Sequence, residues 1–161
     1  MKLPQHPRIR PSTVRNLLAL KSAAVHPVMA GATVRDALKL MAEDDVGAVV
    51  VLDGGHVAGI FSEREHARMG CVGAGTADAT PVSHVMTVCG VFATPPQTVQ
   101  ECLELMNEKR LQYIPVIEGG RLLALLSIGD LLEETIAHYE RIFQALELDQ
   151  RILFLQGTYS C

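Results

Sequence analysis

The chain has 161 residues and a net charge of −4 at pH 7; 48% of its residues are hydrophobic and 4% are aromatic. This hydrophobic content is enough for one domain, or two small fused units, with an aliphatic core. The negative charge argues against general nucleic-acid binding, and no apolar run reaches the roughly 18 residues that would span a membrane.

Cysteine usage indicates the expected compartment. The chain forms no C-x-x-C pair and has no histidine at metal-ligand spacing from its cysteines, Cys71, Cys89, Cys102 and Cys161. This pattern disfavours a metal site and a disulfide framework and fits a reducing cytosol. Because no charged-then-apolar signal peptide opens the chain either, we expect a cytoplasmic protein.

The first 22 residues form a basic lead-in. The first acidic residue, Asp36, is preceded by Lys2, Arg8, Arg10, Arg15, Lys21 and Arg35. A transit peptide or a nucleic-acid arm would explain this bias. The prolines at positions 4, 7 and 11 break any amphipathic helix there, so a plain solvated lead-in is favoured. After it, Ser12 is predicted to cap a short helix that contains Leu17, Leu18 and Leu20.

The central part of the chain contains the same pattern twice. Thr33-Val-x-x-Ala-Leu-x-Leu-Met41 reappears as Thr98-Val-x-x-Cys-Leu-x-Leu-Met106, at an offset of 65 residues and without a gap. At the same offset, Gly54-Gly55 falls on Gly119-Gly120, Ser62 on Ser127 and Glu65 on Asp130. An ungapped match that places glycines and serines together indicates duplication of one structural unit.

Each copy predicts the same order of elements, β-α-β-β-α. An extended piece, at 24–28 or 90–93, precedes a helix that is capped by Thr33 or Thr98. Two strands then flank a Gly-Gly turn, at 48–52 and 56–61 or at 113–117 and 122–126. A second helix begins at Ser62 or Ser127. Since one unit of about 50 residues buries too little surface alone, the two should pack sheet against sheet in one body.

The second strand-to-helix junction carries the strongest candidate for a polar site. Residues 122–126 are apolar, and Ser127 and Asp130 follow at the start of the helix. A hydroxyl and a carboxylate can accept hydrogen bonds, and the free N–H groups of a helix start favour an anion nearby. The alternative is that Ser127 caps the helix and Asp130 occupies its acidic first turn, as these residue types commonly do.

The repeated segments resemble the tandem CBS domain pair, named for cystathionine beta-synthase and often called a Bateman module. The resemblance extends from about Ala24 to Glu134 and rests on Gly59-Ile-Phe-Ser-Glu-Arg-Glu65, Val85-Met-Thr87, Leu111-Gln-Tyr-Ile-Pro-Val116 and Leu125-Leu-Ser-Ile-Gly-Asp130. It implies an α/β (α+β) fold of two β-α-β-β-α repeats packed as a pseudo-two-fold pair, with a C-terminal helical extension. The expected segments are a lead-in with a short helix at 1–22, repeat 1 at 23–70, a linker at 71–81, repeat 2 at 82–137, and a C-terminal helix and tail at 138–161.

The resemblance also implies a ligand. CBS pairs bind adenosine-containing ligands such as AMP, ADP, ATP or S-adenosylmethionine in clefts between the repeats, and no other cofactor is expected. Carried over to this sequence, the ribose would be held by Asp130, Ser127, Glu65 and Ser62. The phosphate would be held by Arg64, Lys21 and Gly129. The adenine would contact Tyr113, Ile114, Pro115, Val91, Ala93, Gly47, Ala48 and Val49.

Two positions depart from the family pattern. Glu65 stands where the family has Asp, and its extra methylene means that the first site either still reaches ribose or is lost. Ala124 stands where a glycine usually precedes the second motif. The apolar candidates could equally be ordinary core residues, and Arg64 an exposed charge on a helix face. The second site, with Asp130, is therefore the stronger candidate.

After the second copy, an apolar seam at heptad spacing consists of Leu132, Ile136, Tyr139, Phe143 and Leu146. It could pack on its own domain or pair two subunits. CBS pairs resemble discs that dimerise through their helices, so we expect a homodimer with this helix in or near the interface. Residues 151–155 would then also need cover, which a partner subunit could supply.

The favoured function is a regulatory module that senses an adenine nucleotide or adenosyl ligand and acts on a regulated protein that the sequence does not identify. A ligand-free structural dimeriser is the alternative. An enzyme is disfavoured, because no nucleophile–base pair, metal cluster or catalytic phosphate loop is visible and the histidines are scattered. Neither nucleic acid nor a membrane is an expected partner.

Overall fold

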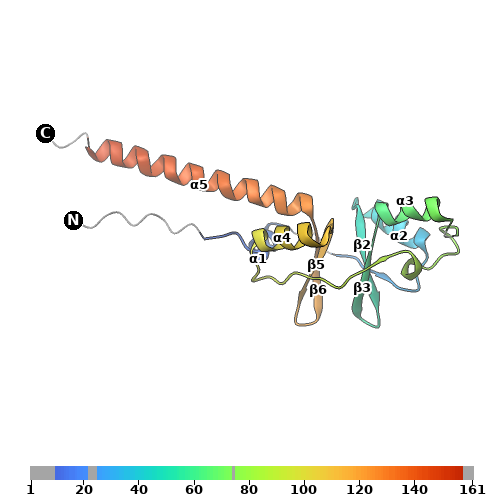
Figure 1. The fold of residues 1–161 in the computed structure, drawn as a ribbon. Coiled ribbons are helices and arrows are strands. Elements are labelled where there is room, and N and C mark those ends of the chain that lie inside the picture. The colour runs from blue at the N-terminus through green and yellow to red at the C-terminus, as the bar shows by residue number, and fades with distance from the viewer. Residues whose placement is uncertain (1–9, 22–24, 74, 158–161) are drawn as a thin grey trace.

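The computed structural model describes residues 10–21, 25–73 and 75–157. Its first half contains α1 (Val14–Leu20), β1 (Val28–Met29), α2 (Val34–Glu43), β2 (Ala48–Asp53), β3 (His56–Ser62) and α3 (Glu63–Val72). Its second half contains the 3-10 helix η1 (Val82–His84), β4 (Thr87–Val88), α4 (Val99–Lys109), β5 (Tyr113–Glu118), β6 (Arg121–Ser127) and α5 (Ile128–Gly157). The two hairpins lie side by side in Figure 1, with α2 and α3 outside one, α1 and α4 outside the other, and α5 extending away.

The two copies fold alike, as the sequence repeat predicts. α2 and α4 begin after Thr33 and Thr98, each of which forms a capping box with the acidic residue three positions later. The two hairpins also share their register, because Ala48 lies opposite Ser62 and Tyr113 opposite Ser127. Positive φ angles at both Gly-Gly turns explain why glycine occupies them. The predicted α+β fold of two β-α-β-β-α units is confirmed.

The first strand is shorter than predicted in the first unit and does not form in the second. β1 begins only at Val28, and the sheet order in the first half is β1-β2-β3-β4, while β5 and β6 pair alone. No strand forms at 90–93; Ala93 makes one parallel bridge to Val116. Its N–H donates to the Pro115 carbonyl at 2.8 Å, and its carbonyl accepts from the Ile117 N–H at 2.9 Å. Pro95 lacks an N–H, so the pairing does not continue.

The segment that precedes each repeat binds the other repeat. The Val99 N–H donates to the Ser12 carbonyl at 2.9 Å, and the Val14 N–H donates to the Gln97 carbonyl at 2.8 Å. In the first half, the corresponding bonds join Val34 N–H to the Thr80 carbonyl at 2.9 Å and Val82 N–H to the Ala32 carbonyl at 2.8 Å. These reciprocal hydrogen bonds connect the two halves of the chain. Thr80, near the end of the predicted 71–81 linker, takes part in them through its carbonyl group.

The exchange also completes two separate cores. Val82 of η1 is buried in the first core, together with Val28, Val34, Ala37, Met41, Val49, Val51, Phe61 and Met69. Val14 and Leu17 of α1 are buried in the second core, together with Ala93, Val99, Cys102, Met106, Ile114, Val116, Ala124, Leu126 and Leu131. Each repeat therefore depends on apolar side chains from the segment that precedes the other one.

The predicted cap of α1 is wrong by one residue. Thr13 caps the helix and accepts a hydrogen bond from the Asn16 N–H, whereas the Ser12 hydroxyl donates to Glu134 Oε1 at 2.6 Å. Glu134 is almost fully buried and also accepts from Arg141 Nη2 at 2.7 Å. Ser12 is drawn away from the cap because a buried carboxylate needs hydrogen-bond donors.

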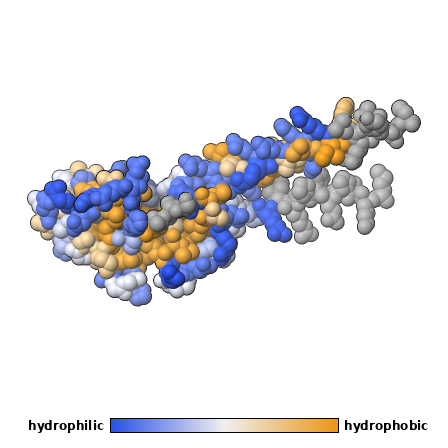
Figure 2. All heavy atoms as spheres, turned by 180° about the vertical axis from the view of Figure 1, so that it is seen from behind, coloured by the Kyte–Doolittle hydropathy of each residue, from blue (hydrophilic) through white to orange (hydrophobic). Residues whose placement is uncertain are grey.

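α5 is longer and more exposed than its counterpart α3. It runs for 30 residues without a break at the predicted boundary of residue 138, and it includes the 151–155 stretch. Leu131 is fully buried, but all five residues of the predicted seam are exposed, from 38% at Leu146 to 65% at Phe143. Figure 2 shows apolar surface both on the body and again on the far part of this helix.

Shortening a buried side chain of α1 should destabilise the whole protein, because α1 completes the second core. We expect Leu17→Ala, at a site that is 5% exposed, to cost about 2–4 kcal/mol in the free energy of unfolding. The matched control on the same helix is Leu20→Ala, at a site that is 69% exposed, with an expected cost below about 0.5 kcal/mol. Urea unfolding measures both, and equal effects would contradict the packing of α1.

Candidate ligand-binding site

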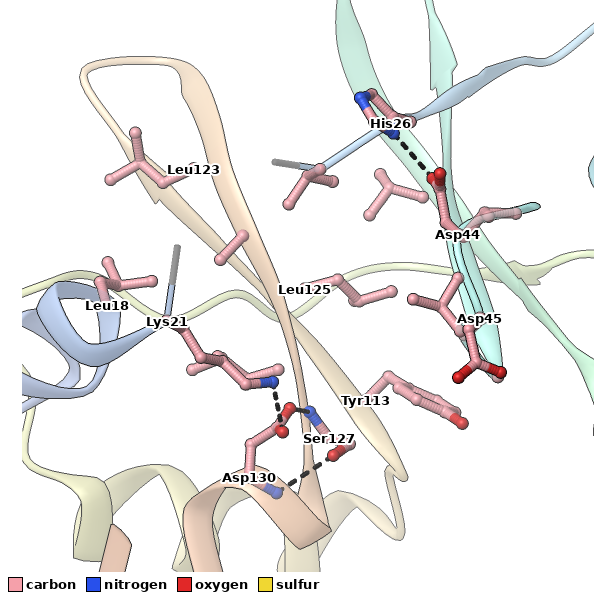
Figure 3. A pocket seen from close by; sticks show the side chains of 18 residues that line it. Leu18, Lys21, His26, Asp44, Asp45, Tyr113, Leu123, Leu125, Ser127 and Asp130 are labelled. Atoms are coloured by element: carbon pink, nitrogen blue, oxygen red, sulfur yellow. Dashed lines mark hydrogen bonds and ion pairs between the residues drawn. The ribbon is translucent and has the colours of Figure 1, made fainter. Parts of the chain in front are cut away.

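A cavity of about 560 Å³ lies between the two repeats and the end of α1. It is lined by Leu18, Lys21, Val25, His26, Asp44, Asp45, Val46, Gly47, Ala48, Val49, Val50, Tyr113, Leu123, Ala124, Leu125, Leu126, Ser127 and Asp130 (Figure 3). Its volume lies in the range of pockets that hold small organic ligands. The cavity exists only because segments far apart in the sequence meet there.

Strand alternation supplies the apolar walls of this cavity. Val49 and Val51 point into the first core, so Ala48 and Val50 on the same strand face the second repeat. On β6, Ala124 and Leu126 belong to the second core, while Leu123 and Leu125 face the cavity. The result is a largely aliphatic space that suits the face of a flat ring.

Gly47 and Tyr113 meet where the two repeats come closest at the cavity. A Cβ atom placed on Gly47 would lie 2.6 Å from the Tyr113 hydroxyl oxygen, so any other residue at position 47 would force the tyrosine side chain to shift. The glycine therefore allows the tyrosine to reach across. A tyrosine ring at this position offers both an apolar face and a hydroxyl to a ligand.

The Ser127–Asp130 junction opens into the same cavity. The Ser127 N–H donates to Asp130 Oδ2 at 2.7 Å, and the Asp130 N–H donates to Ser127 Oγ at 3.1 Å. Asp130 Oδ1 forms an ion pair with the ammonium of Lys21, the C-cap of α1. The helix-cap interpretation of these two residues is thus confirmed, yet both remain part of the cavity wall.

The Asp130 carboxylate is held in its ionised form. Burial alone would raise its pKa, but hydrogen bonds from Lys21 and Ser127 and the charge of Lys21 together lower it below the ordinary 3.8. An ionised carboxylate accepts hydrogen bonds at both oxygens, so it can bind two neighbouring hydroxyl groups once Lys21 moves aside.

The predicted twin site around Glu65 is closed. Glu65 is only 8% exposed, and Glu65 Oε2 accepts hydrogen bonds from the Ser62 backbone and side chain. Glu65 Oε1 accepts from the Thr87 hydroxyl of β4 at 2.9 Å. Neither Ser62 nor Glu65 lines the cavity. Because Glu65 is buried and lies outside the cavity lining, the structure does not bring Ser62 and Glu65 to the space that Ser127 and Asp130 face.

The other predicted site residues divide between the cavity and the core. Gly47, Ala48, Val49, Tyr113, Lys21, Ser127 and Asp130 line the cavity. Ile114 and Ala93 are fully buried in the second core, and Val91 packs against it. Arg64 is exposed on α3, Gly129 lies in the first turn of α5 outside the lining, and Pro115 lines a separate cavity of about 290 Å³. Strand alternation explains Ile114, which points away from the side of Tyr113.

The structure also brings in charged residues that the sequence interpretation missed. His26 Nδ1 lies 2.7 Å from Asp44 Oδ2, and Asp45 follows at the turn between α2 and β2. Figure 3 shows them across the cavity from Lys21 and Asp130. For Asp44 and Asp45 the available signal was their position two to three residues before Gly47, a predicted ligand contact.

Comparison with known proteins fits this fold. A family model described as CBS domain matches residues 20–65 and again residues 82–137. A solved protein with CBS domains from Burkholderia ambifaria MC40-6 is 40% identical at a TM-score of 0.73, covering 78% of this chain and 95% of that one. The Arabidopsis thaliana CBS domain-containing protein CBSX3, mitochondrial, is 32% identical over 132 residues, which are 79% of this chain. The chain belongs to the CBS domain family and carries a tandem pair.

The comparisons also bear on ligands and on length. Two further solved pairs share the fold at low identity: CBSX2 in complex with AMP (18%, TM-score 0.63), and the CBS domain pair of MJ0100 in complex with 5′-methylthioadenosine and S-adenosyl-L-methionine (14%, TM-score 0.66). They cover 78% and 80% of this chain, and 97% and 98% of their own. The chain spans 62% of the length of CBSX3, the Arabidopsis relative. Among the described residues, no helix is long and apolar enough to cross a bilayer.

The lowered pKa of Asp130 predicts a pH-dependent contribution to stability. A carboxylate with a depressed pKa stabilises the fold above its ordinary pKa of 3.8, and this contribution is lost as the pH falls through the lower pKa of the folded state. The free energy of unfolding of Asp130→Asn should therefore lie about 1 kcal/mol below wild type at about pH 7 and converge on it at about pH 2.

Urea unfolding across this pH range measures the difference. The matched control is Asp149→Asn, because Asp149 is exposed on the far part of α5. A difference for Asp130→Asn that stays constant with pH would show that its carboxylate is not held by Lys21 and Ser127.

Proposed function

We propose that this chain is a regulatory module that binds an adenosine-containing ligand in the cavity between its two CBS repeats. The observation that carries the proposal is the Asp130 carboxylate, which lies in an otherwise largely aliphatic cavity at the start of α5. A ring and a pair of ribose hydroxyls match this combination of surfaces. The ligands of CBSX2 and MJ0100, to which the chain is similar in fold, support the class of ligand.

Under this proposal each part of the ligand has a named contact. Asp130 accepts from the ribose hydroxyls, with Ser127 beside it. Tyr113, Gly47, Ala48 and Val49 contact the adenine. One site, not two, binds the ligand, since Glu65 is buried and lies outside the cavity lining. No other cofactor is required.

The bound ligand would touch three parts of the chain at once. Lys21 belongs to α1, Ala48 belongs to β2 of the first repeat, and Asp130 belongs to α5. Occupancy therefore changes how these elements are held together, and a regulated protein or a second subunit senses that change. A non-enzymatic role and a cytoplasmic location complete the proposal.

Isothermal calorimetry with AMP, ADP, ATP and S-adenosyl-L-methionine tests the binding. At least one ligand should bind below millimolar concentration, and Asp130→Ala should weaken it about ten- to hundredfold, as expected for hydrogen bonds to a charged group. Asp149→Ala should leave the affinity unchanged. Because Asp130 also caps α5, its variant should lose about 1 kcal/mol of stability, so binding is measured well below its Tm.

If none of the four ligands binds, the sensor proposal is refuted and the second candidate, a ligand-free structural dimeriser, is favoured. The same titrations monitored for nucleotide turnover test the non-enzymatic role. Nucleotide turnover by the wild-type protein that is lost in Asp130→Ala would show that the chain is an enzyme and contradict the non-enzymatic role.

We also propose that two copies pair through α5. The helix presents the seam Leu132, Ile136, Tyr139, Phe143 and Leu146 at heptad spacing, and all five side chains are exposed in the described part of the chain. Exposed apolar side chains in such a row are usually buried by a partner. A second copy offers the same seam and the same spacing.

Light scattering at roughly micromolar concentration should give the mass of a dimer. Phe143→Glu puts a charge into the seam and should yield a monomer, whereas Gln144→Glu, at a neighbouring exposed position outside the seam, should leave the dimer intact. A wild-type monomer at this concentration, or a Phe143→Glu dimer, would refute the pairing.

A further inference from the structure

The ionisable side chains that line the cavity are mostly acidic. Three carboxylates line it, those of Asp44, Asp45 and Asp130, against one ammonium, that of Lys21. Lys21 is already paired with Asp130, and His26 is paired with Asp44. Among the described residues, no hydrogen bond or ion pair is found for Asp45, whose side chain lines the cavity across from Lys21 and Asp130 (Figure 3).

Tyr113 lies close to further acidic side chains, of which Asp130 lines the cavity and Glu63 and Glu65 do not. Burial raises the pKa of its hydroxyl, and the nearby carboxylates of Glu63, Asp130 and Glu65 raise it further. These three acids come from both repeats. The negative potential therefore extends across the side of the cavity where the two repeats meet.

The cavity offers little to a phosphate group. The described part of its lining contains no arginine, and Arg64 is exposed on α3 outside it. Two N–H groups at the start of α5 are already engaged, because that of Ile128 donates to the Gln112 carbonyl and that of Asp130 donates to Ser127 Oγ. A phosphate would have to take Lys21 from Asp130 while lying close to acidic side chains.

The second repeat shows the reverse arrangement at the matching positions. At the offset of 65 residues, Lys109 and Arg110 stand where the first repeat has Asp44 and Asp45. Asp45 and Arg110 even share the left-handed backbone conformation, with φ angles of 52° and 54°. The same backbone conformation thus occurs with an acidic residue in one repeat and a basic residue in the other, so the backbone does not require Asp44 and Asp45 at this turn.

Resting on the proposed function, we infer that this cavity selects an adenosyl ligand with a net positive charge, such as S-adenosyl-L-methionine, over the 5′-phosphates AMP and ATP. Asp45 is the main specificity-determining residue, and Asp44 supports it. A charge at the centre of a cavity of this volume lies about 5 Å from its wall, within the Debye length of about 8 Å at physiological salt. A charge near the middle of the bound ligand thus interacts with both aspartates.

Calorimetric titration of the full chain with S-adenosyl-L-methionine, 5′-methylthioadenosine, AMP and ATP tests the inference. We expect S-adenosyl-L-methionine to bind most tightly, followed by 5′-methylthioadenosine, AMP and ATP, with S-adenosyl-L-methionine at least about tenfold tighter than AMP. This difference in affinity should become smaller as the salt concentration is raised. The uncharged 5′-methylthioadenosine separates the effect of charge from the effect of the adenosyl group.

Two substitutions at Asp45 and one control sharpen the test. Asparagine tolerates the left-handed conformation, so Asp45→Asn should reduce the ratio of the affinities for S-adenosyl-L-methionine and AMP several-fold without disturbing the backbone. Asp45→Arg copies the second repeat and should make AMP the tighter ligand. The control Asp53→Asn, at the end of β2 and outside the cavity lining, should leave the affinities for all four compounds unchanged. Unchanged melting temperatures confirm that the variants are folded.

The outcomes separate the two proposals. If none of the four compounds binds, the proposed function fails and the inference fails with it. If AMP or ATP binds as tightly as S-adenosyl-L-methionine, the inferred selectivity for a positively charged ligand is refuted. The same holds if Asp45→Arg still prefers S-adenosyl-L-methionine to AMP by the wild-type ratio. In both cases the proposed adenosyl-binding function stands.

Discussion

The reciprocal exchange of segments between the two repeats is the constraint on which the rest of this structure depends. Each repeat is closed by backbone hydrogen bonds and apolar side chains from the segment that precedes the other one. The same exchange builds the cavity, because α1 ends at Lys21 and its packing on the second core brings that residue to Asp130. A fold whose halves closed on their own segments would lack this contact.

Duplication supplied two matching junctions, and small changes in side-chain length and charge made them different. Glu65 is one methylene longer than Asp130, and it accepts from Thr87, which closes the first junction. Asp130 meets a lysine and faces an aliphatic cavity. The turns before the two hairpins differ in the sign of their charge, with Asp45 in one and Arg110 in the other. The asymmetry thus lies in a few side chains on a symmetrical backbone.

α5 connects the candidate ligand site with the candidate interface. Its first turn carries Asp130, its second holds the buried Glu134 against Ser12 of the lead-in, and its remaining turns carry the exposed apolar seam. A continuous helix transmits a change at one end as a change of direction at the other. Under the proposed function, ligand binding and assembly are therefore properties of one rigid element.

The repeat, the helix caps at Thr33 and Thr98, both Gly-Gly hairpins and the junction at Asp130 could be predicted from the sequence alone, because caps, turns and periodicity are local interactions. Tertiary packing was needed to show that Glu65 is buried, that Lys21 pairs with Asp130 and that Asp44 and Asp45 line the same cavity. Those contacts join residues up to 109 positions apart. No local pattern encodes them, since they follow from how the two repeats exchange segments and pack.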